Sequence, residues 1–294
     1  MKLLIFGYGF SAKALVRTLE PKQVESIVVT TRSTEKLQSL AGTEVTPCLF
    51  PGSDMRDEIA QATHVLISAG PEDGRDPVLA ELSDTFADAV HLEWVGYLST
   101  TGVYGDHGGD WVTEDTALTP STERGQARVD AETKWMDLYR DSGLPVHLFR
   151  LAGIYGPGRG PFAKVRKGTA RRIIKEGQVF SRIHVDDIAQ VLLASMDRPN
   201  PGAAYNVCDD DPAPPQDVIA HAAELLGLPI PPGIPIAEAE MSPMARSFYA
   251  ESKRVDNTRI KSELGVTLRY ANYREGLAQL LAIERKLADD AAKP

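Results

Sequence analysis

The first dozen residues constrain the fold of this chain more than any other stretch. A short apolar run, Leu3–Phe6, leads directly into the pattern Gly7-x-Gly9-x-x-Ala12. Apolar residues then recur at helical spacing until Pro21, which stops the helix. The order strand, glycine turn, helix places a dinucleotide pyrophosphate on the N-terminus of a helix. There Gly7 permits the tight turn, Gly9 lets the backbone approach phosphate, and Ala12 lets helix and strand pack closely.

Composition excludes several classes of protein. The chain has 294 residues, of which 43% are hydrophobic, so it can bury a full core. Its net charge of −9 disfavours nucleic-acid binding, which usually requires a basic surface. No apolar stretch approaches the roughly 18 residues that a membrane helix needs, and the apolar run near the N-terminus is too short for a secretory signal. We therefore expect a cytoplasmic protein without nucleic-acid or membrane partners.

The cysteines and histidines show no ligand pattern. Cys48 and Cys208 lie far apart in the sequence, which argues against a disulfide scaffold and fits a reducing compartment. The six histidines form no paired spacing of the kind that binds metal. We therefore predict that the protein holds no metal ion.

Apolar runs alternate with helical patterns through the first half of the chain, which predicts an α/β fold with a doubly wound parallel sheet, the Rossmann fold. The predicted strands are Leu3–Phe6, Glu25–Thr30, Glu44–Leu49, His64–Ser68, Trp94–Leu98 and Val146–Arg150. The predicted helices between them are Ser33–Leu40, Asp57–Gln61, Pro77–His91 and Ser121–Arg140, and Gly42 and Gly143 stand where helices end.

The regular alternation of apolar runs and helical patterns ends after residue 151. Leu151–Pro161 is rich in Gly and Pro and is predicted to be a loop. A helix is predicted over Asp186–Met196, with Asp186 or Asp187 as its N-cap, and a further strand over Ala203–Val207. We expect a Rossmann domain over residues 1–155 and a smaller substrate-binding region over 156–294, partly interleaved with it. The oligomeric state stays open.

The end of the second strand bears on the choice of cofactor. NAD-binding folds place an acidic residue there to bind the ribose 2′-hydroxyl. This chain has Arg32 and Ser33 instead, which would attract a 2′-phosphate. The pattern favours NADP over NAD. In the structural alternative, Ser33 is only an N-cap and Arg32 is solvated.

Four further motifs follow in order: Ser99-Thr-Thr-Gly-Val-Tyr-Gly105, Leu151-Ala-Gly-Ile-Tyr-Gly-Pro-Gly158, Arg182-Ile-His-Val-Asp-Asp-Ile-Ala189 and Tyr205-Asn-Val207. Together with the glycine turn, this series resembles the extended short-chain dehydrogenase/reductases, the NAD-dependent epimerase/dehydratase family. The resemblance runs from Met1 to about Ala288 and is closest to the bacterial YeeZ-like subgroup.

The resemblance implies roles for particular residues. Thr100 matches the hydroxyl residue that bonds the reacting oxygen of the substrate, although a strand-end hydroxyl that caps local backbone is an equal alternative. Ser68–Gly70 matches the loop under adenosine and pyrophosphate, Asp54 and Met55 the pair beside adenine, and Leu151–Gly153 the nicotinamide side. The implied cofactor-binding residues are Gly7, Tyr8, Gly9, Phe10, Ser11, Ala12, Arg32, Ser33, Asp54, Ser68, Ala69, Gly70, Arg128, Leu151, Ala152 and Gly153.

The chain departs from the family pattern at the catalytic pair, a Tyr followed by a Lys four residues later. Alignment places Arg124 at the Tyr position and Arg128 at the Lys position. Arg128 can still bind ribose or phosphate, but Arg124 cannot replace a Tyr acid, because a guanidinium does not release its proton near neutral pH. The YeeZ-like subgroup also lacks the Tyr.

Other tyrosines lie near the motifs. Tyr249 and Lys253 have the family's spacing but lie far from the expected helix, and we assign them to the substrate-side surface. Tyr104 and Tyr155 are phenols near motif loops, for which packing is the favoured role over catalysis.

A basic segment stands out in this acidic chain. Residues 159–175 contain seven Lys and Arg and no acid. Such a cluster can bind a phosphate, a carboxylate or a nucleotide-sugar pyrophosphate, or it can be a solvated face that offsets nearby acids. Arg171 and Arg172 are the candidate substrate-binding residues of this segment. His184 is a further candidate, with a scaffold role favoured.

These observations lead to one main hypothesis and one rival. The main hypothesis is an NADP-dependent oxidoreductase or epimerase-type enzyme that transfers hydride at the nicotinamide and acts on a small, anionic or sugar-like substrate. The rival is a catalytically silent NADP-binding sensor or partner-binding protein, which the missing Tyr and Lys favour.

Overall fold

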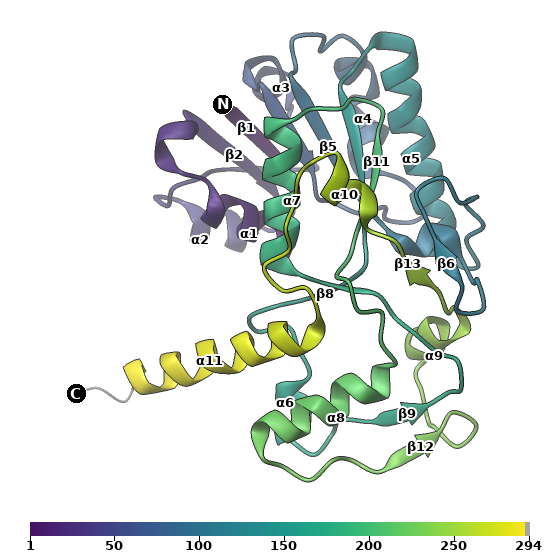
Figure 1. Cartoon of the computed structure of the whole chain (residues 1–294). Coiled ribbons are helices and arrows are strands. Elements are labelled where there is room, and N and C mark those ends of the chain that lie inside the picture. The colour runs from purple at the N-terminus through teal and green to yellow at the C-terminus, as the bar shows by residue number, and fades with distance from the viewer. Residues whose placement is uncertain (292–294) are drawn as a thin grey trace.

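A parallel seven-stranded sheet forms the centre of the protein (Figure 1). The computed structural model describes residues 1–291, except the side chain of Met244. The strand order is β11-β7-β5-β4-β1-β2-β3, which reverses direction between β1 and β4, as in a doubly wound sheet. The strands are β1 (Lys2–Phe6), β2 (Ser26–Thr31), β3 (Thr46–Leu49), β4 (His64–Ile67), β5 (Trp94–Thr100), β7 (Val146–Leu151) and β11 (Ala204–Val207). The predicted fold class is confirmed.

Helices cover both faces of the sheet and bury a separate core on each. On one face, α1 (Phe10–Thr18) packs beside α7 (Val185–Asp197) against β1, β5 and β7. On the other face lie α3 (Arg56–Gln61), α4 (Pro77–Ala87) and α5 (Glu123–Ser142). The helix α2 (Thr34–Leu40) connects β2 to β3. Because both faces are covered, the central strands β1, β4, β5 and β7 are almost entirely buried.

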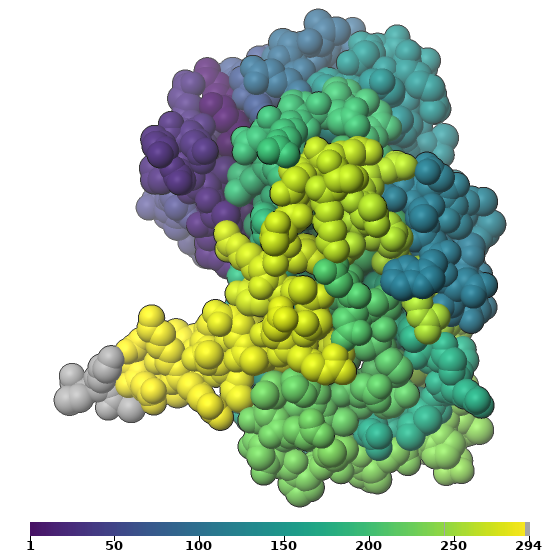
Figure 2. All heavy atoms as spheres, in the orientation of Figure 1, coloured from purple at the N-terminus to yellow at the C-terminus, as the bar shows by residue number. Residues whose placement is uncertain are grey.

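Several segments after residue 152 form a lobe below the carboxyl edge of the sheet in Figure 1. Its own core joins Tyr155 and α6 to the helices α8 and α11. The lobe contains β8 (Gly153–Tyr155), α6 (Phe162–Arg166), β9 (Arg172–Ile174), β10 (Arg182–His184), α8 (Pro215–Leu226), β12 (Gly233–Pro235), α9 (Pro243–Ala250) and α11 (Tyr273–Ala291). The far half of α11 projects away from the body (Figure 2) and is exposed.

The second half of the chain also contributes to the first. After β10, the chain returns to the large sheet as α7 and β11. The short strand β13 (Arg254–Val255) pairs with β6 (Trp111–Val112), and α10 (Thr258–Ser262) packs near β11. Two 3₁₀ helices, η1 (Pro21–Gln23) and η2 (Thr101–Tyr104), complete the elements. The boundary at residue 155 stays a prediction.

Two local expectations are wrong. The segment predicted as a loop contains β8, because its backbone pairs with β10 at a distant point of the chain. The N-cap of α7 is His184, whose Nδ1 accepts a hydrogen bond from the backbone N–H of Asp186. Asp187 instead accepts hydrogen bonds from the backbone N–H groups of Arg269 and Tyr270. By contrast, Gly143 ends α5 in the left-handed conformation, as predicted.

Within residues 1–291, no helix combines the length and apolar character that crossing a membrane requires. Over the same residues, no cluster of three or more His, Cys, Asp or Glu side chains has a metal-binding arrangement.

Buried His147 makes the stability of this fold depend on pH. Its Nε2 accepts a hydrogen bond from the backbone N–H of Asn200, its ring stacks on Trp94, and burial lowers its pKa from 6.5 to about 4. The stabilising effect of the neutral ring is therefore complete above pH 6.5 and is lost as the pH falls toward 4, because the unfolded chain binds the proton first.

We expect His147→Gln, which keeps an acceptor, to remove this dependence. The variant should gain about 3 kcal/mol relative to the wild type between pH 7 and pH 4, from roughly 1.4 kcal/mol per unit of pKa shift. Urea unfolding at a series of pH values measures the difference, and other titrating groups cancel in it. A constant difference across this range would contradict the prediction.

Candidate functional site

The glycine turn after β1 lies directly against the loop after β4. Gly7 has a φ of +90°, and a Cβ there would lie 2.8 Å from the backbone nitrogen of Ala69. Gly9 is the N-cap of α1, supplies no capping side chain, and has nothing within 4 Å of its would-be Cβ. Ala12 is fully buried. Gly7 is thus required for the close approach, and Gly9 leaves open space beside the start of α1.

The end of β2 is occupied by an ion pair. Arg32 Nη1 lies 2.5 Å from Glu72 Oε2 in the loop after β4, and both side chains are more than half exposed. Ser33 is the N-cap of α2, since its Oγ accepts a hydrogen bond from the backbone N–H of Lys36. The structural alternative for Ser33 therefore matches its geometry, and Arg32 is solvent-exposed but also paired with Glu72.

Sequence analysis missed two amines at the same corner. Lys36 Nζ donates to the carbonyl of Tyr8 at 2.7 Å, and Lys13 Nζ lies 5.7 Å from the centroid of the Tyr8 ring. Burial, and secondarily the charge of Lys13, lowers the pKa of Lys36. Neither amine has an ion-pair partner in the described part of the chain. Lys36 follows Arg32 by only four residues in the sequence, which was the available signal.

Arg128 joins the carboxyl ends of β4 and β5. A Cβ on Gly70 would lie 2.4 Å from its Nη2, so the guanidinium rests on that glycine. Its Nη1 donates to the carbonyl of Leu98 at 2.5 Å and to the hydroxyl of Tyr97 at 3.2 Å. The residue that aligns with the family's Lys therefore does lie beside the predicted cofactor loop Ser68–Gly70.

Asp54 and the segment Leu151–Gly153 mark two further points of the predicted cofactor site. Asp54 is exposed after β3 and pairs with Arg56 at 3.4 Å, whereas Met55 is fully buried. Leu151 and Ala152 are buried at the end of β7, and Gly153 is exposed. Both segments lie where strands of the sheet end on its carboxyl side.

Thr100 ends β5 with its hydroxyl partly engaged. Its Oγ1 accepts a hydrogen bond from the backbone N–H of Gly102 at 3.2 Å and so caps η2. The hydroxyl hydrogen remains available for donation, and the residue is half-buried. The capping alternative therefore matches the geometry without preventing a role in substrate binding.

The side chains of Tyr104 and Tyr155, the tyrosines near these motifs, are buried and packed against other residues. Tyr104 donates to Asn206 and accepts from Arg150, and burial raises its pKa to about 12. Tyr155 packs in the core of the lobe, where burial raises its pKa. Arg124 lies exposed in the first turn of α5. These side chains do not present an acidic phenol at the end of β5.

Lys253 of the Tyr249–Lys253 segment is a structural tether. Its Nζ donates to the carbonyl of Gly105 at 2.5 Å and pairs with Glu251 at 2.7 Å. Tyr249 instead lies edge-on to Phe180, and its carbonyl accepts from Lys175. The segment thus ties the loop after η2 to the lobe. The side chains of Tyr249 and Lys253 contact different residues and do not form a pair.

The basic segment does not gather into one cluster. Arg171 donates to the carbonyl of Glu240, and Arg172 lies on β9, which pairs with β12 at the far end of the lobe (Figure 1). Arg166 pairs with Glu284 on α11. The role of Arg171 and Arg172 in substrate binding stays a prediction, and this dispersal favours the solvated alternative.

His184 is buried with no exposed surface. Its ring contacts Tyr155 and Tyr270, at centroid distances of 5.2 and 4.2 Å. Burial lowers its pKa, which favours the neutral ring. Contact with a substrate would require these neighbours to move, so the geometry favours the scaffold role.

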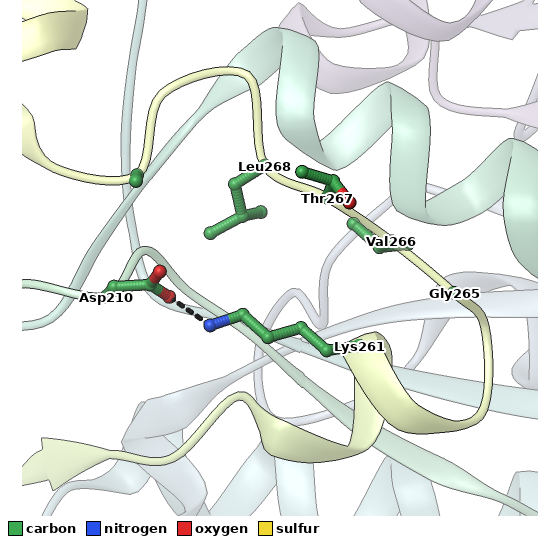
Figure 3. Close-up of a pocket in the computed structure, with 7 residues that line it drawn as sticks. Asp210, Lys261, Gly265, Val266, Thr267 and Leu268 are labelled. Carbon is green, nitrogen blue, oxygen red and sulfur yellow. Dashed lines mark hydrogen bonds and ion pairs between the residues drawn. The ribbon is translucent and has the colours of Figure 1, made fainter.

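A different set of residues lines a surface hollow of about 390 Å³ (Figure 3). In it, Lys261 extends toward Asp210, and their charged atoms lie 2.6 Å apart. Val266, Thr267 and Leu268 form part of its lining. None of the residues in its lining belongs to the predicted cofactor or substrate sites.

The doubly wound sheet, the glycine turn and the lobe beyond β7 define an extended short-chain dehydrogenase/reductase with an NAD(P)-binding Rossmann fold. The profile of the NAD-dependent epimerase/dehydratase family matches residues 3–208, and this chain belongs to that family.

Comparison with three known proteins shows how similar this chain is to each of them. It is 28% identical to protein YeeZ of Escherichia coli K12, over 92% of this chain and 96% of that protein. A functionally unknown conserved protein from Silicibacter pomeroyi is 56% identical, with a TM-score of 0.89 over 96% of this chain and 99% of the other. UDP-glucuronic acid 4-epimerase from Bacillus cereus, solved in complex with NAD, shares the fold at 17% identity and a TM-score of 0.76, over 98% and 99%.

Proposed function

We propose that this protein is an NADP-dependent oxidoreductase or epimerase-type enzyme that acts on a small, anionic or sugar-like substrate. A continuous chain of contacts supports the proposal. Gly7 touches Ala69, Gly70 touches Arg128, and Arg128 bonds the carbonyl of Leu98, two residues before Thr100. The glycine turn, a cation and a hydroxyl thus meet at one edge of the sheet, where open α/β sheets bind ligands.

The chain's own residues would divide the chemistry as follows. Thr100 would donate its hydroxyl hydrogen to the substrate oxygen, while Gly102 holds the hydroxyl in place. Arg128 would bind the ribose or a phosphate through the N–H groups that Leu98 and Tyr97 leave unused. A bound nicotinamide supplies the hydride. The proton has to come from a group other than Tyr104 or Tyr155, since both phenols are buried.

A second candidate is a catalytically silent NADP-binding sensor. The observation that favours it is the exposed Arg124 at the position of the family's Tyr. General acid–base catalysis contributes about 10²–10⁴-fold to rate, so its loss could leave binding without turnover.

One experiment separates these candidates. The protein is titrated with NADPH and NADH, then incubated with NADPH and a panel of carbonyl compounds and nucleotide sugars. Turnover of any member supports the enzyme. Tight coenzyme binding without turnover favours the sensor, and no binding of either coenzyme rejects both.

The corner at Arg32 yields a prediction on coenzyme choice. We expect Arg32→Ala to weaken NADPH binding about tenfold, the effect of one charge-assisted contact, and to leave NADH binding within about twofold. Glu72→Gln should strengthen NADPH binding by no more than about fivefold, because an exposed ion pair contributes at most about 1 kcal/mol. Calorimetric dissociation constants for both coenzymes measure the effects. Wild-type NADH binding as strong as NADPH binding would refute the preference for NADP.

A further inference from the structure

A tight turn of the lobe reaches back to the start of α1. After β8, the backbone N–H and C=O groups of Gly156 and Arg159 pair with each other in both directions at 2.9 Å. Gly158 takes a φ of +74° inside this turn. The turn therefore fixes the point from which the side chain of Arg159 departs.

This turn packs against Phe10, the first residue of α1. A Cβ on Gly156 would lie 3.0 Å from Cζ of Phe10 and 2.6 Å from Cγ1 of Val185. The guanidinium carbon of Arg159 lies 5.7 Å from the centroid of the Phe10 ring. The cation is thereby placed beside the glycine turn, although the two segments are about 150 residues apart in the sequence.

The charge of Arg159 is not neutralised there. Among the described residues, Arg159 forms no ion pair, whereas Arg166 in the same basic segment pairs with Glu284. The first turn of α1 carries no acidic residue, and its N-cap, Gly9, has no side chain. Arg159 and the backbone N–H groups at the start of α1 thus form a positive environment.

We propose that Arg159 binds the pyrophosphate of the dinucleotide cofactor together with the backbone of Gly9 to Ser11. The inference rests on the proposed function, because it assumes that the dinucleotide occupies the glycine turn. A guanidinium offers several N–H donors in a planar fork that suits phosphate oxygens. The lobe would then complete the cofactor site, and Arg159 would belong to the cofactor rather than to the substrate.

The test uses the full chain and the two coenzymes as probes. NADPH and NADH share the pyrophosphate and differ at the 2′-phosphate, so Arg159→Gln should weaken both about tenfold or more and leave their ratio unchanged. Arg159→Lys should recover part of the loss, because it keeps the charge without the fork. The matched control is Arg166→Gln, which should leave both constants unchanged. Thermal unfolding verifies that each variant folds.

The outcomes separate the inference from its premise. If the wild type binds neither coenzyme, the proposed function fails, and the inference fails with it. If the wild type binds and Arg159→Gln stays within about twofold for both coenzymes, only the inference is overturned. A loss confined to NADPH would also overturn it, because it would place Arg159 at the 2′-phosphate.

Discussion

Replacing Arg150 by Met is expected to destabilise the folded protein by about 3–5 kcal/mol, because it leaves the carboxylate of Glu132 buried without its counter-charge. The two side chains are 7% and 3% exposed, and Arg150 Nη2 lies 2.8 Å from Glu132 Oε2. Ser99 also donates to Glu132, at 2.5 Å. The pair therefore joins β7 and α5 directly beneath the end of β5, where Thr100 lies.

Urea unfolding at neutral pH measures this effect. The control is Arg140→Met, which removes an exposed pair with Asp137 and should cost at most about 1 kcal/mol. Adding Glu132→Leu to Arg150→Met should restore part of the stability, because it removes the uncompensated charge. A loss for Arg150→Met no greater than that of the control would contradict the expectation.

Gly7→Ala is expected to weaken dinucleotide binding about 100-fold or more. The new Cβ would lie 2.8 Å from the backbone nitrogen of Ala69, and backbone cannot move aside as a flexible side chain can. The turn would have to shift, and loss of one or two hydrogen bonds to a charged phosphate, each contributing about 1.5–3 kcal/mol, accounts for the loss in affinity.

Gly42→Ala is the matched control for this variant. Gly42 has a similar φ of +80°, but nothing lies within 4 Å of its would-be Cβ, so the substitution introduces backbone strain alone. It should lower stability by about 1–2 kcal/mol and leave coenzyme binding unchanged. Equal coenzyme affinities of the two variants, measured by calorimetry, would show that the close approach at Gly7 is not needed for binding.

The sheet and the glycine turn could be predicted because their signals are local. Buried parallel strands such as β1 and β4 appear as short apolar runs, and Gly143 marks a helix end within its own segment. Each of these features depends on neighbours within one helix or strand.

Several features that sequence analysis missed involve distant partners. The Asp side chains near the start of α7 were expected to cap it, but Asp187 bonds backbone more than 80 residues away. The ion pair of Arg32 with Glu72 and the tether of Lys253 to Gly105 had no signal in the sequence pattern. The basic segment is continuous in the sequence, but Arg166 contacts α11 and Arg171 contacts the carbonyl of Glu240.

The sequence by itself therefore determined the fold class and the turn at Gly7–Ala12, since each depends on residue type and short-range spacing. Only the tertiary structure decided which charges meet. In it, Arg32 pairs with Glu72, Arg128 contacts Gly70, and Arg159 lies over the ring of Phe10. The physical reason is that side-chain contacts between distant segments are set by how the strands pair and the helices pack, which no local pattern encodes.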